Sequence, residues 1–169
     1  MVQKKICMVG VFSVGKTAMV QQYVHSIFTA KYLTTVGVKI DRKDVQVGDQ
    51  SLTMMLWDLE GRDHEGDINP SYVRGAHGVI YVIDGTRRET FDQIFQIRDM
   101  VTGTIGDVPS VVAVNKTDLT DQWQLKPSDE EAIEAQGLHR IRTSAKTGDG
   151  VNATFQWLAE ALLQTPGAR

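Results

Sequence analysis

Two kinds of apolar pattern alternate along the chain. Continuous apolar runs, typical of strands buried on both faces, lie at residues 6–9, 78–84 and 110–114, with a shorter run at 139–143. Between them, apolar residues recur every three or four positions, which indicates helices with one buried face. The three clearest faces are Met19, Val20, Tyr23, Val24 and Ile27; Phe91, Ile94, Phe95, Ile97 and Val101; and Val151, Phe155, Leu158 and Leu162. This alternation predicts a parallel sheet covered by helices.

Residues 38–47 and 51–58 instead alternate between apolar and polar positions. Gly48-Asp49-Gln50 joins them and predicts a hairpin. The alternation slips once between Asp41 and Asp44. One strand of this pair must run against the others, and the edge of the sheet suits it. The charged, glycine-containing residues 59–71 predict a loop or a poorly formed helix.

The predicted fold class is therefore α/β, as a doubly wound, six-stranded and mostly parallel sheet with one antiparallel edge strand and about five helices. A further helix is expected to begin at Pro127, where acidic residues follow that suit the positive end of a helix. A length of 169 residues indicates a single domain, which we place at residues 1–165, with 166–169 as a tail remnant.

Composition narrows the possible partners and location. The net charge of −3 argues against nucleic acid as a partner, since binding it favours a basic stripe. The only cysteine, Cys7, lies in the first apolar run, which is compatible with a reducing cytosol, so we expect a cytoplasmic protein. We find no apolar run of membrane-spanning length and no cysteine in the last residues, which predicts no direct membrane anchor in this chain. Membrane association is expected only if a C-terminal tail is missing from this sequence or a partner recruits the protein.

The first apolar run leads into Gly10-Val11-Phe12-Ser13-Val14-Gly15-Lys16-Thr17, which fits the phosphate-binding pattern G-x-x-x-x-G-K-[ST]. A strand precedes the loop and a helical pattern follows, as this motif requires. Successive backbone N–H groups would form a concave nest for phosphate beside the positive end of the helix. Lys16 would place its charge on the outer phosphates, and Thr17 would offer its hydroxyl to Mg²⁺.

Three later strand ends also carry candidate chemistry. Asp58 ends the second hairpin strand and could reach Mg²⁺ through a water, while Gly61 could bring its N–H to a terminal phosphate. The run 110–114 ends in Asn115-Lys116-Thr117-Asp118. A carboxylate at 118 can accept two hydrogen bonds from the edge of guanine but not from that of adenine. Ser144-Ala145-Lys146 follows the last strand, where the Ala145 N–H could donate to guanine O6.

These motifs, in this order and spacing, resemble those of a Ras-superfamily small GTPase over essentially the whole chain, and several stretches are most similar to the Rab branch. The resemblance implies GTP or GDP as ligand, with Mg²⁺ as cofactor. Phe28 would pack against the guanine, and Thr35 would ligate Mg²⁺ and touch the γ-phosphate. The implied nucleotide contacts are Gly10, Ser13, Val14, Gly15, Lys16, Thr17, Ala18, Phe28, Thr35, Gly61, Asn115, Lys116, Asp118, Ser144, Ala145 and Lys146. The implied metal ligands are Thr17, Thr35 and, through water, Asp58.

The resemblance also implies two switch loops, near 30–40 and 59–75, which effector and regulatory proteins would read in the two nucleotide states. Trp57 and Tyr72 match two apolar effector-facing positions of Rab proteins, and Ile40 stands where phenylalanine is usual. The protein itself is expected to be a monomer.

Departures from the family pattern concern catalysis. The implied catalytic residues are Lys16, Thr35, Gly61 and Arg62, but Arg62 stands where the family has a glutamine that orients the attacking water. Arginine has no acceptor for that water, so slow turnover is expected, unless the side chain supplies a cation in cis. Phe12 occupies a position where a small residue is usual, and Glu60 adds a carboxylate near the phosphates. Residues 64–69 also lack the usual Rab sequence.

Three hypotheses follow. The first is a guanine-nucleotide switch that hydrolyses GTP slowly. The second is a binding module locked in the GTP state, because Phe12, Glu60 and Arg62 abolish hydrolysis. The third is a P-loop ATPase or small kinase, which predicts a preference for adenine that the motifs at 115–118 and 144–146 argue against.

Overall fold

The computed structural model describes residues 2–29, 37–59 and 68–164. Six strands form one sheet in the order β2-β3-β1-β4-β5-β6. Neighbouring strands are parallel except for β2, which pairs antiparallel with β3 at the edge. This confirms the predicted class and topology. The strands are β1 (Val2–Val9), β2 (Val38–Val47), β3 (Gln50–Leu59), β4 (Gly78–Asp84), β5 (Ser110–Asn115) and β6 (His139–Arg142).

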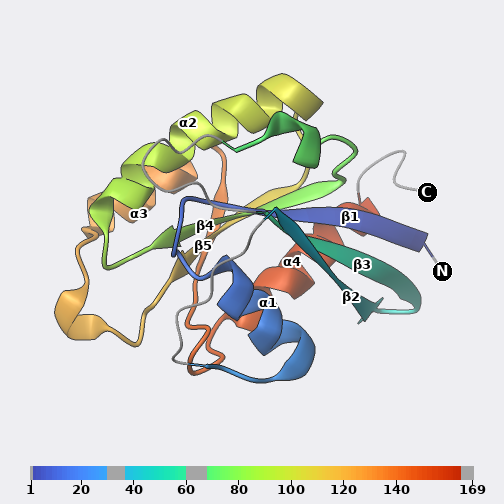
Figure 1. Ribbon diagram of the computed structural model, residues 1–169, viewed down its shortest axis with the longest axis horizontal. Helices are drawn as coiled ribbons and strands as arrows, with labels where there is room; N and C mark the ends of the chain where they lie inside the picture. Colours follow the sequence, from blue (N-terminus) through green and yellow to red (C-terminus); the bar gives the residue numbers. More distant parts are fainter. Residues whose placement is uncertain (1, 30–36, 60–67, 165–169) are drawn as a thin grey trace.

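Helices cover both faces of the sheet, with α1 and α4 on one side and α2 and α3 on the other (Figure 1). About five helices were expected, but the described residues form four α-helices and two short 3-10 helices. The prediction was too high because the charged stretch near residue 70 forms only one 3-10 turn in its described part. The elements are α1 (Lys16–His25), α2 (Arg88–Ile105), α3 (Pro127–Ala135), α4 (Val151–Gln164), η1 (Pro70–Tyr72) and η2 (Thr120–Gln122).

The first helix is shorter than its apolar periodicity predicts. Ser26 has a left-handed backbone with φ of 55°, and its N–H donates to the carbonyl of Gln22, which ends α1 after His25. Ile27, expected on the buried helical face, instead follows the helix and is 53% exposed. A local backbone reversal therefore overrides the spacing of the side chains.

The β2–β3 ladder runs without interruption from Val38 opposite Leu59 to Val47 opposite Gln50. The slip in the sequence pattern is thus a change of face and not an inserted residue. Ile40 lies on one face and is 45% exposed, whereas Val45 lies on the other and is buried. An edge strand tolerates this change because neither of its faces is fully covered.

The parallel strands bring their carboxyl ends to one edge of the sheet. Every residue of β4 is buried, as are the last four of β1 and the last five of β5, so these strand ends are firmly held by the core. The strand order reverses at β1, and ligands of such sheets bind outside the carboxyl ends at that reversal. The loop that follows β1 lies at this point.

Candidate functional site

The phosphate loop between β1 and α1 is built on two glycines that allow no side chain. A Cβ on Gly10 would lie 2.4 Å from the carbonyl oxygen of Val82, and a Cβ on Gly15 would lie 2.3 Å from Nδ2 of Asn115. Gly15 also has a φ of 105° and caps the N-terminus of α1. The loop therefore packs directly on the ends of β4 and β5, with α1 leading away from it.

Lys16 is 6% exposed, and its ammonium lies inside the curve of the loop. Nζ donates to the carbonyl oxygens of Gly10 and Val11, at 2.9 Å each. Burial lowers the pKa of Lys16 to about 8, the charge of Asp58 opposes this shift, and the charge of Arg87 adds to it. A positive charge that is poorly solvated and surrounded by loop carbonyls is poised to accept an anionic ligand.

Two oxygen-bearing side chains meet at the start of α1. The hydroxyl of Thr17 donates to the Oδ2 atom of Asp58, and Asp58 is fully buried at the carboxyl end of β3. Hydroxyl and carboxylate oxygens are ligands that Mg²⁺ prefers, and it usually takes its remaining ligands from water and substrate phosphates. Within residues 2–29, 37–59 and 68–164, no group of three His, Cys, Asp or Glu side chains could hold a metal by itself. The site fits Mg²⁺ shared with a phosphate ligand.

The loops after β5 and β6 are tied to the phosphate loop by one buried amide. Asn115 donates from Nδ2 to the carbonyl oxygen of Val14 at 3.0 Å. Its Oδ1 accepts from the hydroxyl of Thr143 at 3.0 Å and from the N–H of Ala145 at 3.3 Å. The hydroxyl of Ser144 donates to Asp118 at 2.7 Å. The structure thus brings together three of the motifs that the sequence predicts to act together.

Two residues at the end of β4 were missed by sequence reasoning. Asp84 is 1% exposed, and its carboxylate bonds to Thr86, Arg87 and Lys116. Arg87 also donates to the carbonyl of Phe12 in the phosphate loop, at 2.7 Å. No motif marks either residue. The available signal was position, because Asp84 ends a fully buried strand, and site residues lie at or directly after the ends of both neighbouring strands, β1 and β5.

Comparison with known proteins agrees with this geometry. The model of the Ras family matches residues 5–164. The chain belongs to the Ras family. Its relatives include the Ras-related proteins Rab-18-B of Danio rerio and Rab-18 of Caenorhabditis briggsae, each 31% identical over 96% of this chain and over 80% and 81% of the respective relative. Rab-32C of Dictyostelium discoideum is 30% identical, over 95% of this chain and 74% of its own length. This Ras-family chain is therefore a Rab-like small GTP-binding protein.

For the other predicted site residues of this Ras-family protein, the structure gives at most their burial and their place in the chain. Phe28 follows α1 and is 42% exposed, so it is not a core residue. Ala18 is half-buried in the first turn of α1, and Lys146 is exposed. Thr35, Gly61 and Arg62 lie outside the described residues, as do Glu60 and His64. Residues 30–36 of one predicted switch loop and residues 60–67 of the other also lie outside them.

The three residues expected to face effectors, Ile40, Trp57 and Tyr72, are all described by the structure. Ile40 and Trp57 lie directly opposite each other in the β2–β3 ladder and therefore share a face. Lys5 places its Nζ 3.6 Å from the centre of the half-buried Trp57 ring.

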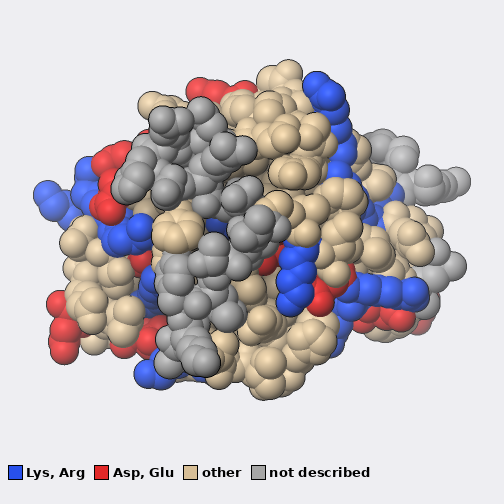
Figure 2. Space-filling view, in the orientation of Figure 1, with Lys and Arg blue, Asp and Glu red and all other residues tan. Residues whose placement is uncertain are grey.

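Basic and acidic side chains are interspersed on the face that Figure 2 shows. None of the described helices is both long enough and apolar enough to span a membrane.

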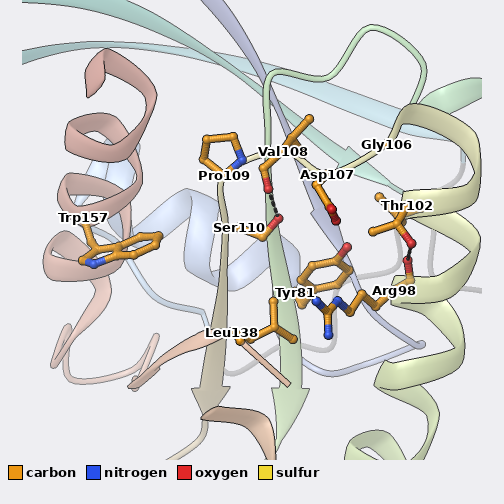
Figure 3. Close-up of a pocket in the computed structure, with 12 residues that line it drawn as sticks. Tyr81, Arg98, Thr102, Gly106, Asp107, Val108, Pro109, Ser110, Leu138 and Trp157 are labelled. Atoms are coloured by element: carbon orange, nitrogen blue, oxygen red, sulfur yellow. Dashed lines mark hydrogen bonds between the residues drawn. The ribbon is translucent and has the colours of Figure 1, made fainter. Parts of the chain in front are cut away.

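A cavity of about 390 Å³ lies elsewhere in the Ras-family fold, between α2, α4 and the start of β5 (Figure 3). Tyr81, Arg98 and Trp157 contribute to its walls. Its lining contains none of the residues predicted to bind nucleotide or metal. Because its lining includes Val108, Pro109 and Ser110 at the amino end of β5, it lies away from the carboxyl ends of the strands.

Proposed function

We propose that this protein is a guanine-nucleotide switch that binds GTP and GDP with Mg²⁺, hydrolyses GTP slowly and is read by effectors through its switch loops. The observation that carries the proposal is the side chain of Asn115, which is 1% exposed and joins the phosphate loop to the loop at Ala145. A single ligand with phosphates at one end and a base at the other fits this arrangement.

At the phosphate end, the N–H groups of the loop and the ammonium of Lys16 would hold the β- and γ-phosphates. Thr17, Asp58 through a water, and Thr35 would hold Mg²⁺, which neutralises phosphate charge when bound. Hydrolysis would be an in-line attack of water on the γ-phosphate, with Lys16 stabilising the charge that develops. Gly61 would donate its N–H to the γ-phosphate.

At the base end, Asp118 would accept from the N–H and NH₂ groups of guanine, and Ala145 would donate to its O6. Ser144 supports this role because its hydroxyl holds one oxygen of Asp118 in place. Phe28 and the stem of Lys116 would cover the faces of the ring.

Asp118→Asn tests the choice of base. Asparagine replaces one acceptor by a donor, so one guanine group loses its partner, and we expect GDP affinity to fall about 100-fold. Competition of GDP and ADP against a fluorescent guanine nucleotide measures the change. Asp121→Asn, at an exposed position of the same loop, is the matched control and should leave affinity unchanged. Stronger competition by ADP than by GDP in the wild type would instead indicate the ATPase hypothesis.

Arg62→Gln tests the catalytic part of the proposal. Because arginine cannot accept a hydrogen bond from the attacking water, we expect wild-type turnover at or below about 10⁻⁴ s⁻¹ and a faster reaction in the glutamine variant. Single-turnover phosphate release from protein loaded with Mg²⁺–GTP measures both. A silent wild type beside an active variant would identify a GTP-locked binding module. A wild-type rate a hundredfold above the expected value would show that another residue orients the water.

Effectors, an exchange factor and an activator would bind at the switch loops and at the neighbouring face that carries Ile40 and Trp57. Ile40 is 45% exposed, and an exposed apolar side chain beside an aromatic ring suits a protein partner.

A further inference from the structure

Three consecutive carbonyl groups of the phosphate loop are each held by a side chain from outside the loop. Arg87 donates to the carbonyl of Phe12 at 2.7 Å, Lys116 to that of Ser13 at 3.1 Å, and Asn115 to that of Val14 at 3.0 Å. Lys116 and Asn115 belong to the base-recognition motif. Arg87 comes from a different element, the residue that immediately precedes α2.

Holding these carbonyls fixes the directions of the next three N–H groups. A trans peptide unit is planar, so its C=O and N–H point in opposite directions. The described peptide bonds include no cis bond. The three side chains therefore aim the N–H groups of Ser13, Val14 and Gly15 away from themselves, toward the concave side where a phosphate would lie.

One buried carboxylate positions two of these three side chains. Asp84 accepts at Oδ2 from Nε of Arg87 at 3.0 Å, and the same oxygen lies 2.9 Å from Nζ of Lys116. Its Oδ1 accepts from the N–H and the hydroxyl of Thr86 at 2.8 and 2.6 Å. Burial raises the pKa of Asp84, but hydrogen bonds from Thr86 and Lys116 outweigh it, and the pKa lies below its usual value. The ionised carboxylate thus orients Arg87 toward the loop.

The loop needs such support at Ser13. This residue has a φ of 67°, in the left-handed region that a side chain disfavours. A strained residue of this kind persists when its surroundings hold it, and the carbonyls on both sides of its Cα, those of Phe12 and Ser13, are the ones that Arg87 and Lys116 bind.

We propose that Arg87 is a positioning residue for the bound nucleotide, acting as the third anchor of the phosphate loop. The inference rests on the proposed function, because it concerns the same ligand. Arg87 acts through the peptide between Phe12 and Ser13. Loss of the anchor loosens an N–H that binds phosphate and speeds release of the nucleotide.

The test is the dissociation rate of a fluorescent GDP from Mg²⁺-loaded protein in wild type, Arg87→Gln and Arg88→Gln. Removing a charge-assisted hydrogen bond is expected to raise the rate about tenfold in Arg87→Gln. Arg88→Gln removes the same charge from the next residue, whose guanidinium binds Asp92 and Asp129 instead, and is expected to keep the wild-type rate. Arg87→Lys keeps the charge without the planar fork that spans Asp84 and Phe12, so an intermediate rate is expected.

The outcomes separate this inference from the proposed function. Failure of wild-type protein to retain GDP would overturn the proposed function itself. Retention of GDP by the wild type with an unchanged rate in Arg87→Gln would overturn only the third anchor. Equal acceleration in Arg87→Gln and Arg88→Gln would show a general loss of charge and would also overturn it. The ratio of Arg87→Gln to wild type should persist in EDTA, because the anchor acts on the loop; its disappearance would assign the effect to Mg²⁺ and contradict the inference.

Discussion

Lys16 keeps a charged group at 6% exposure, which costs stability until an anion binds. Its pKa in the folded chain is lowered to about 8 from an ordinary value of 10.5, chiefly by burial. Between these values the unfolded lysine holds a proton that the folded one has released. Unfolding therefore takes up a proton in this window, and the stability of nucleotide-free protein rises with pH from about 8 to 10.5.

Lys16→Met removes this proton linkage while keeping most of the side-chain volume. We expect the variant without nucleotide to be more stable than wild type at pH 7, by up to about 3 kcal/mol, with an advantage that shrinks as the pH rises above 8. Urea unfolding at pH 7 and 9.5 measures the difference. Lys146→Met, at an exposed lysine, serves as the control. Parallel pH curves for Lys16→Met and wild type would show that the buried lysine does not titrate in this range.

At the scale of elements, one glutamate fastens α3 to β6. Glu130 is 2% exposed, and its carboxylate accepts from Arg140 at 3.2 Å and from two nitrogens of Arg142 at 2.8 and 2.6 Å. Arg142 is the last residue of β6, directly before the loop that carries Ser144 and Ala145. This contact therefore fixes the strand that leads into the loop at Ser144 and Ala145, where we propose that the base binds.

Glu130→Gln is expected to lower the free energy of unfolding by about 2 kcal/mol, because it removes the charge from several hydrogen bonds of a buried carboxylate. The value is moderate because Arg142 is 55% exposed and partly solvated. Glu131→Gln, an exposed neighbour on the same helix, should change stability by less than about 0.5 kcal/mol. Urea unfolding of both variants checks the difference, and an equal effect in the two would contradict this role of Glu130.

The sequence predicts elements well where one physical signal dominates. The runs at 78–84 and 110–114 are apolar enough to be buried strands in any context, and both lie in the middle of the sheet. The end of α1 could not be predicted, because the left-handed backbone at Ser26 opposes an apolar periodicity that continues to Ile27. Local backbone geometry of this kind leaves no clear trace in the spacing of side chains.

In the candidate site, too, some residues could be predicted from the sequence and others could not. The phosphate loop and the motifs at 115–118 and 144–146 have recognisable residue patterns, so each could be located in the sequence before the fold was known. Asp84 and Arg87 carry no such pattern. Arg87 contacts Phe12, 75 residues away in the sequence, and only the packing of β4 beside β1 brings the two together, while Asp84 contacts Lys116 just after β5. A long-range side-chain contact to a backbone carbonyl places almost no requirement on nearby sequence.

At the scale of the whole molecule, the order of the strands brings the candidate site residues together. The chain leaves β1, forms a hairpin on one side and then crosses to β4, so β1 has parallel neighbours on both sides. The polar residues that follow β1, β3, β4, β5 and β6 consequently meet along one edge, although they are spread over more than a hundred positions in the chain. The Ras-family function proposed above depends on this convergence more than on any one element.

The edge position of β2 has a further consequence for how these molecules behave at high concentration. An edge strand offers unused backbone hydrogen bonds to the next polypeptide and can seed growth of a continuous intermolecular sheet. Between Lys39 and Asp44, every residue except Ile40 is charged, and the charges point to both faces of the strand. A second chain adding to this edge would have to strip water from them. Side chains with no part in nucleotide binding thus guard the protein against fibrous aggregation.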